Sequence, residues 1–193
     1  MRGLKSENMT HSTSYNSSET LESFLARHVP FGGWREEWLG VPLEFRTFLA
    51  DELPPRAFVG SVRAIVLRDN KVLLVYSDIP ILSVGGRCEP GETIEQTLLR
   101  EVAEETGWNV SPVAVIGFTH CHHLDGQRPD WGRPAPDWID PCFAVVAESY
   151  EANIIEQNAA RCEFVSIDEA ERCGLHEIDR IWLREALRKR LAS

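Results

Sequence analysis

Residues 86–108 read GRCEPGETIEQTLLREVAEETGW, and this stretch decides the fold. A Pro-Gly pair within it makes a turn, because both residue types favour turn dihedrals. Beyond the turn, Ile94, Leu98 and Val102 recur at the spacing of one helix face. The pattern predicts a glycine-rich turn that leads into a helix whose apolar face packs into a core.

Three acidic side chains crowd another face of the same predicted helix. Glu101, Glu104 and Glu105 stand at positions i, i+3 and i+4, where side chains are neighbours and like charges repel. A divalent cation would offset that repulsion, and carboxylate oxygens suit Mg²⁺ or Mn²⁺. The simpler interpretation is a solvated acidic face, and spacing decides between the two.

The spacing resembles the signature of the Nudix hydrolases. Gly86 is followed after five residues by Glu92 and after seven more by the run REVAEETGW over residues 100–108. One departure precedes the box, where Ser83-Val84 replaces the Leu-Pro common in that family. The resemblance implies an α/β fold, a Nudix-type α/β/α sandwich with a mixed sheet, over residues 58–193.

The same resemblance implies hydrolysis of a diphosphate bond in a nucleoside diphosphate linked to another moiety. Glu101, Glu104, Glu105 and Glu92 would hold or assist Mg²⁺ or Mn²⁺, and Glu101 would also be the general base. Arg100 would pair with a carboxylate and fix its rotamer. A base on a later loop is the alternative, with candidates Glu148, Glu151, Glu156 and Glu163.

Substrate contacts are expected from two parts of the chain. Gly85 and Gly86 form the loop before the helix, and Arg63 is the charge in the middle of a strand that begins a hairpin. An arginine there reaches a phosphate or simply extends to solvent. A long loop between two later strands carries Trp131 and Trp138, which could stack a base, while its arginines, Arg128 and Arg133, could contact phosphate. This loop either sets substrate choice or forms a rigid structural cover.

The loop also contains the run His120-Cys121-His122-His123. Adjacent ligands lack the spaced pairs of structural zinc sites, so the run argues weakly for zinc.

The first third of the chain predicts an extension. Residues 1–19 read as a flexible polar tail, and residues 20–57 as a helical N-terminal extension. Helical spacing around Leu21 predicts one short helix, and the spacing of Phe45, Phe48 and Leu49 predicts a second. Trp34 and Trp38 between them either pack the extension onto the domain, line a base-binding surface or contribute to a homodimer; packing is favoured.

Composition narrows the partners. The 193 residues carry 30 acidic and 20 basic side chains, so a formal charge of −10 disfavours general attraction to nucleic acid or to anionic membranes. The five cysteines show no paired framework and no apolar run is long enough to span a bilayer, so we expect reduced thiols and a cytoplasmic location. A small-molecule diphosphate is the expected partner.

Two other functions fit the resemblance less well. A non-catalytic Nudix-fold ligand-sensing module would tolerate loss of the box glutamates, which this chain keeps. An isomerase of an allylic diphosphate would need an acid and a cysteine facing each other across a pocket, and the sequence does not show this for Cys88 or Cys121.

Overall fold

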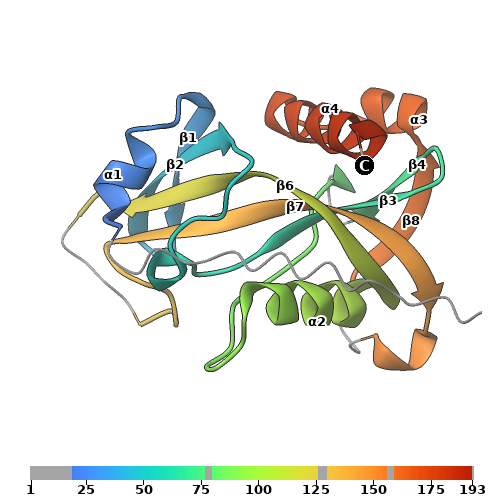
Figure 1. Ribbon diagram of the computed structural model, residues 1–193, viewed down its shortest axis with the longest axis horizontal. Helices are drawn as coiled ribbons and strands as arrows, with labels where there is room; N and C mark the ends of the chain where they lie inside the picture. The colour runs from blue at the N-terminus through green and yellow to red at the C-terminus, as the bar shows by residue number, and fades with distance from the viewer. Residues whose placement is uncertain (1–18, 77–79, 126–129, 156–158, 193) are drawn as a thin grey trace, which may run out of the picture.

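The computed structural model describes residues 19–76, 80–125, 130–155 and 159–192. Within them the chain forms a mixed sheet with helices on both faces, as the sequence predicts (Figure 1). The predicted tail, residues 1–19, lies outside the described residues except for its last position. The strands are β1 (Pro30–Trp38), β2 (Val41–Leu49), β3 (Arg63–Arg68), β4 (Lys71–Tyr76), β5 (Pro80–Ile81), β6 (Trp108–His123), β7 (Asp137–Tyr150) and β8 (Arg161–Ser166). The α-helices are α1 (Leu21–Leu25), α2 (Ile94–Thr106), α3 (Ile167–Arg172) and α4 (Glu177–Ala192), and 3₁₀ turns lie at Arg56–Phe58 and Ala152–Ile154.

The sheet of the described chain follows the order β1-β2-β6-β7-β3-β4-β5, and β8 also pairs with β4. β3 runs parallel to β7, and the other pairs are antiparallel. The sheet is therefore mixed. Figure 1 shows α2 below it and α4 above it.

Alternation along β3 divides the interior into two cores. Ile65 and Leu67 point to the side of α4, where Trp182 and Leu183 are buried with them. Ala64 and Val66 point to the opposite side and pack with the apolar face of α2. Because successive side chains of a strand point to opposite faces, β3 fixes which face of the sheet each helix covers.

The N-terminal extension differs from the prediction. The short helix α1 is present, but the second predicted helix is wrong, because Phe45, Phe48 and Leu49 lie in strand β2. β1 and β2 form a hairpin whose two-residue turn, Leu39-Gly40, has positive φ at both positions, the geometry that matches strand twist. β2 then pairs with β6, so the hairpin extends the main sheet.

Strands β6 and β7 are longer than the sequence predicts. The His120–His123 run lies inside β6, and Trp138 lies inside β7. The connecting loop is shorter by those residues.

In the part of the chain that the structure describes, no helix has the length and apolar character needed to cross a membrane.

Candidate active site

The helix α2 is set by strong signals at both ends. Thr93 accepts a hydrogen bond from the backbone N–H of Gln96, and the Gln96 side chain accepts one from the backbone of Thr93, which makes a capping box. Gly107 ends the helix with φ 75°, a conformation that favours glycine. The predicted apolar face is buried, so the acidic face is directed away from the core.

Arg100 lies among two carboxylates of this acidic face and that of Glu92 in the preceding turn. Its Nε and Nη2 donate to the two oxygens of Glu92 at 2.7 and 3.0 Å. Its Nη1 donates to Glu101 and to Glu104, both at 2.9 Å. The hydrogen bonds from Arg100 are the largest cause that holds the pKa of Glu92 down at about 2. The repulsion expected from the sequence is thus offset by one guanidinium that fixes three carboxylates at once.

The fourth carboxylate holds the glycine loop. The backbone N–H of Gly85 donates to Oε2 of Glu105 at 2.9 Å. A Cβ at Gly86 would lie 2.4 Å from Oε2 of Glu101, a distance that no side chain tolerates. The two glycines therefore let the loop lie directly against the carboxylates.

The chemistry of this donor set fits a divalent cation, although a guanidinium lies where three of the carboxylates meet. Among the described residues, no group of three or more His, Cys, Asp or Glu side chains is arranged to hold a metal ion. Arg100 lies where the oxygens of Glu92, Glu101 and Glu104 come together. To bind one cation together, these carboxylates would have to turn away from Arg100. Their oxygens are the ligand atoms that Mg²⁺ and Mn²⁺ prefer.

A cavity of about 330 Å³ lies on the other face of the sheet, under the first turns of α4. Thr47, Thr119 and Asp140 line it, and they are direct cross-strand neighbours on β2, β6 and β7. Burial raises the pKa of Asp140, an effect that the positive charges of Arg63 and Arg133 oppose. Polar side chains therefore line the cavity over the middle of the sheet, and aromatic side chains line its sides.

Gly85 connects this cavity to the carboxylates. Arg63 lines the cavity and donates from Nη1 to the carbonyl oxygen of Gly85 at 3.0 Å. The N–H of the same glycine is held by Glu105. Gly85 thus links Arg63 of the cavity to Glu105 of the acidic face by hydrogen bonds.

Comparison with known proteins identifies this arrangement. Residues 58–189 match the model of the NUDIX domain, which is more than half of the chain. The chain belongs to the NUDIX family. This membership confirms the Nudix-type domain that the sequence predicts.

Individual Nudix relatives match over shorter or more divergent regions. A Bacillus subtilis protein whose name proposes 8-oxo-dGTP diphosphatase activity is 41% identical over 56 residues, which span 28% of this chain and 38% of that protein. A solved Nudix hydrolase from Nitrosomonas europaea is 24% identical with a TM-score of 0.48, and the match covers 66% of this chain and 87% of the other. A solved Bacillus subtilis pyrophosphohydrolase is 17% identical with a TM-score of 0.49, and the match covers 81% of this chain and 94% of the other.

The loop tryptophans do not form the open stacking surface that the sequence suggests. Trp138 has no exposed surface and packs in a core cluster with Leu43 and Cys121. Trp131 is half-buried, and its ring lies 6.1 Å from that of Trp38. Base stacking on Trp138 is therefore wrong for this structure, because the sheet and hairpin cover its ring.

The cavity contains residues that sequence reasoning placed elsewhere or missed. Trp34 and Trp38 of the hairpin line it, although packing was the favoured interpretation for them. Thr47 and Asp140 were not singled out at all. The alternation of apolar residues along residues 41–47 was the available signal for a strand, but no pattern shows which strands are neighbours.

Arg87 and Arg133 extend the positive charge around this Nudix site. Arg87 is exposed, donates to the carbonyl of Trp131 at 3.1 Å, and its own carbonyl accepts from Arg100 at 3.1 Å. Arg133 donates to the hydroxyl of Ser61 at 3.2 Å, and burial lowers its pKa. Arg87 was missed by the sequence analysis, whereas Arg133 was named, and Arg128 lies outside the described residues.

The carboxylates proposed as alternative bases are engaged elsewhere. Glu148 bonds Ser111, Glu151 accepts from Asn109 at 2.7 Å, and Glu163 accepts from Arg161 at 2.6 Å. All three are exposed. Glu156 lies outside the described residues.

The histidine run does not form a zinc site in the described chain. His120 Nε2 and His122 Nδ1 instead face one oxygen of Asp137, at 2.8 and 2.7 Å. Cys121, which lies between them in the sequence, is buried and lines the cavity on the other face of the sheet. Alternation along β6 thus sends neighbouring members of the run to opposite sides of the sheet.

Proposed function

We propose that this chain hydrolyses a diphosphate bond in a compound that links a nucleoside diphosphate to another group, in dependence on Mg²⁺ or Mn²⁺. The observation that carries the proposal is the position of Gly85, which is bonded to Arg63 of the cavity and to Glu105 of the acidic helix. This arrangement supports the proposal, because Gly85 joins a residue of the cavity to a carboxylate suited to a cation. A diphosphate between the two parts would lie at the glycine loop.

The chain's own residues divide the work. Glu101, Glu104 and Glu105 would hold the cation, and Glu92 would assist while it keeps Arg100 in place. When bound, the cation would offset phosphate charge and lower the pKa of an attacking water. Glu101 is the proposed general base, since its carboxylate lies against the loop where the phosphorus would be.

Arginines supply the remaining positive charge. Arg63 donates to Gly85 from Nη1, and a guanidinium carries five N–H donors in all. Arg87 is exposed at the other side of the loop. Together they would bind phosphate oxygens on either side of the bond that breaks, which compensates for the negative charge of the whole chain.

The substrate class rests on two supports. The cavity has aromatic and polar walls that suit a nucleoside, and the Bacillus relative is named for a nucleotide substrate. Nucleoside triphosphates and nucleoside diphosphates joined to a sugar or a second nucleoside are therefore the first compounds to test.

The test is release of nucleoside monophosphate from a panel of such compounds, with Mg²⁺, with Mn²⁺ and with a chelator. Glu104→Gln and Glu105→Gln should each lower kcat/KM by about 100-fold or more, because each removes a charged ligand oxygen. Glu95→Gln is the matched control, since Glu95 is exposed on the same helix and outside the cluster. It should keep full activity.

The possible results separate the two candidate functions. Activity that needs metal and falls in both cluster variants supports the hydrolase. Absence of turnover across the panel, with ligand binding retained, would overturn it in favour of a ligand-sensing module. Turnover that is equal in Glu104→Gln, Glu105→Gln and the control would also overturn the assigned roles.

A further inference from the structure

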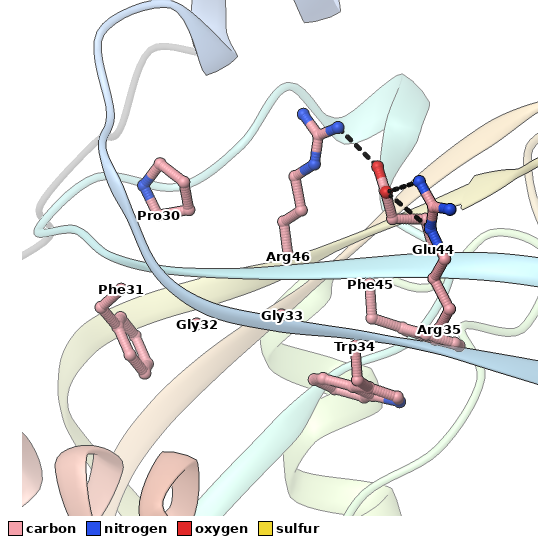
Figure 2. Close-up of a pocket in the computed structure, with 9 residues that line it drawn as sticks. All are labelled: Pro30, Phe31, Gly32, Gly33, Trp34, Arg35, Glu44, Phe45 and Arg46. Atoms are coloured by element: carbon pink, nitrogen blue, oxygen red, sulfur yellow. Dashed lines mark hydrogen bonds and ion pairs between the residues drawn. The ribbon is translucent and has the colours of Figure 1, made fainter.

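One wall of the cavity comes from outside the matched Nudix domain. The family match begins at residue 58, whereas Trp34, Phe45 and Thr47 belong to the β1–β2 hairpin before it. Trp34 stacks on Phe45 with ring centroids 4.7 Å apart and planes 5° apart. Figure 2 shows both rings on one face of the hairpin, while Arg46 extends from the other. The hairpin therefore adds a chain-specific surface to a common domain.

The aromatic pair is only partly covered by the rest of the protein. Phe45 covers one side of the Trp34 indole, yet Trp34 remains 40% exposed. Trp182 of α4, which also lines the cavity, lies close to Gly117, where a Cβ would be 2.7 Å from the indole. The cavity is thus bounded by flat side chains from the hairpin and from α4, as a site for a planar ligand requires.

Two polar atoms in this cavity lack partners. Asp140 Oδ1 and Thr47 Oγ1 are buried and have no hydrogen-bond partner within the described residues. Thr47 and Asp140 are 0% and 7% exposed. A buried polar atom without a partner is destabilising, so a ligand that supplied the missing hydrogen bonds would be strongly preferred over one that could not.

The register places these atoms in a row. Thr47 pairs with Thr119, and Thr119 pairs with Asp140, so the three residues cross three adjacent strands. Two strand spacings make the row roughly 10 Å long. A two-ring base spans more of this length than a one-ring base, and it can contact both ends.

We propose that the row of Thr47, Thr119 and Asp140 selects a purine nucleotide: Asp140 would accept N–H groups from one edge of the base, and the Thr47 hydroxyl would donate to a ring nitrogen at the other. This inference rests on the proposed function and names the substrate class for the same site. The base would lie over the row, between Phe45 and Trp182, and the diphosphate would pass Arg63 toward Gly85. Guanine suits the row best, because it offers an imino and an amino N–H side by side to the carboxylate of Asp140, whereas adenine offers only the amino group.

Nucleosides without phosphate test the inference independently of hydrolysis. Calorimetric titration of the whole chain with guanosine, adenosine, cytidine, uridine and purine riboside measures base recognition alone. Purine riboside keeps both rings but has no N–H on the relevant edge. We expect guanosine to bind at least about tenfold more tightly than purine riboside or the pyrimidines, because unpaired polar atoms reject ligands without donors.

Isosteric variants assign the selectivity to residues. Asp140→Asn and Thr47→Val should each reduce guanosine affinity by about tenfold and narrow its advantage over purine riboside. Glu37→Gln, on the exposed side of β1, is the control. Trp34→Ala is a further variant, needed if the buried substitutions prevent folding. Trp34 lies on the edge strand and is partly exposed, so its replacement should leave the fold intact. It should lower the affinity for all purine nucleosides by a similar factor.

The outcomes distinguish this inference from the proposed function. Hydrolysis with base preferences that survive all three cavity variants would overturn the inference and leave the hydrolase intact. Guanosine binding that depends on Asp140 and Thr47, without turnover of any diphosphate, would overturn the hydrolase and support purine recognition. Equal affinity for guanosine and purine riboside would overturn the inference in either case.

Discussion

Arg100 and Glu92, eight residues apart, form a two-point ion pair in which Nε meets Oε1 at 2.7 Å and Nη2 meets Oε2 at 3.0 Å. The third nitrogen of the guanidinium is thereby directed to Glu101 and Glu104 of α2. Parallel N–H···O bonds of this kind fix orientation as well as charge. Glu92 thus determines how Arg100 faces the acidic cluster.

Arg100→Lys is expected to damage activity more than folding. A lysine ammonium keeps the charge but lacks the fork that reaches three carboxylates at once. We expect kcat/KM for the best diphosphate substrate to fall by about 10- to 100-fold, as for other positioning partners of metal ligands. Arg161→Lys, in an exposed ion pair on β8, is the control and should be silent. Full activity in Arg100→Lys would contradict the positioning role.

The ion pair also predicts an acid dependence of stability. The pKa of Glu92 in the folded chain is about 2, below its ordinary value of 4.5, chiefly because of the bonds from Arg100. A lowered pKa means that the contribution is full above pH 4.5 and is lost as pH falls toward 2. Since the pair is partly exposed to solvent, we expect a contribution on the order of 1 kcal/mol to the free energy of unfolding.

Denaturant titrations between pH 2 and pH 6 measure this contribution. Glu92→Gln should unfold more easily than the parent chain at pH 6 and show a smaller loss of stability on acidification. Glu95→Gln should follow the parent curve. Parallel curves for Glu92→Gln and the parent chain would refute the linkage.

Gly86→Ala is expected to disturb the acidic cluster by a single methyl group. The added Cβ would lie 2.4 Å from Oε2 of Glu101, so Glu101 would have to move. We expect at least about a tenfold loss of kcat/KM, because small displacements of reacting groups are costly. The same substrate and steady-state assay would measure it.

Gly91→Ala provides the contrast. No atom lies within 4 Å of a Cβ at Gly91, but its φ of 88° is strained for alanine. This variant should lose roughly 1 kcal/mol of stability and keep most of its activity. If Gly86→Ala behaved like Gly91→Ala, close contact with Glu101 would not be what requires glycine at position 86.

The sequence predicts those parts of the site that lie close together along the chain. Helix α2, its cap and the acidic face all depend on interactions over three or four residues, which spacing reveals. Spacing does not reveal that Arg100 pairs with three carboxylates rather than one. That count depends on how Glu92 in the turn folds back onto the helix.

The cavity could not be predicted because it depends on strand order. Thr47 and Asp140 are far apart in sequence and become neighbours only through β6.

The wrong prediction of a helix in place of strand β2 has a cause in the local sequence. Phe45, Phe48 and Leu49 fit helical spacing, while the alternation through Val41, Leu43 and Phe45 fits a strand equally well. The pairing of β2 with β6 decides between the two patterns, and no single sequence contains that information.

Opposite effects are expected for the tryptophans of β7 and β1. Trp138 is fully buried among the hairpin and sheet residues, whereas Trp34 faces the cavity and is 40% exposed. Trp138→Ala should therefore lower the free energy of unfolding by about 3–5 kcal/mol. Trp138→Phe should retain the fold at a smaller cost and leave the order of preferred substrates unchanged. Trp34→Ala should change stability little and raise KM, because it removes a side chain that lines the cavity and stacks on Phe45. Urea denaturation and substrate profiles of the three variants check both effects. The opposite result would contradict this prediction: Trp138→Phe changes the order of preferred substrates, while Trp34→Ala changes neither that order nor KM. It would favour the hypothesis that the segment containing Trp131 and Trp138 sets substrate choice.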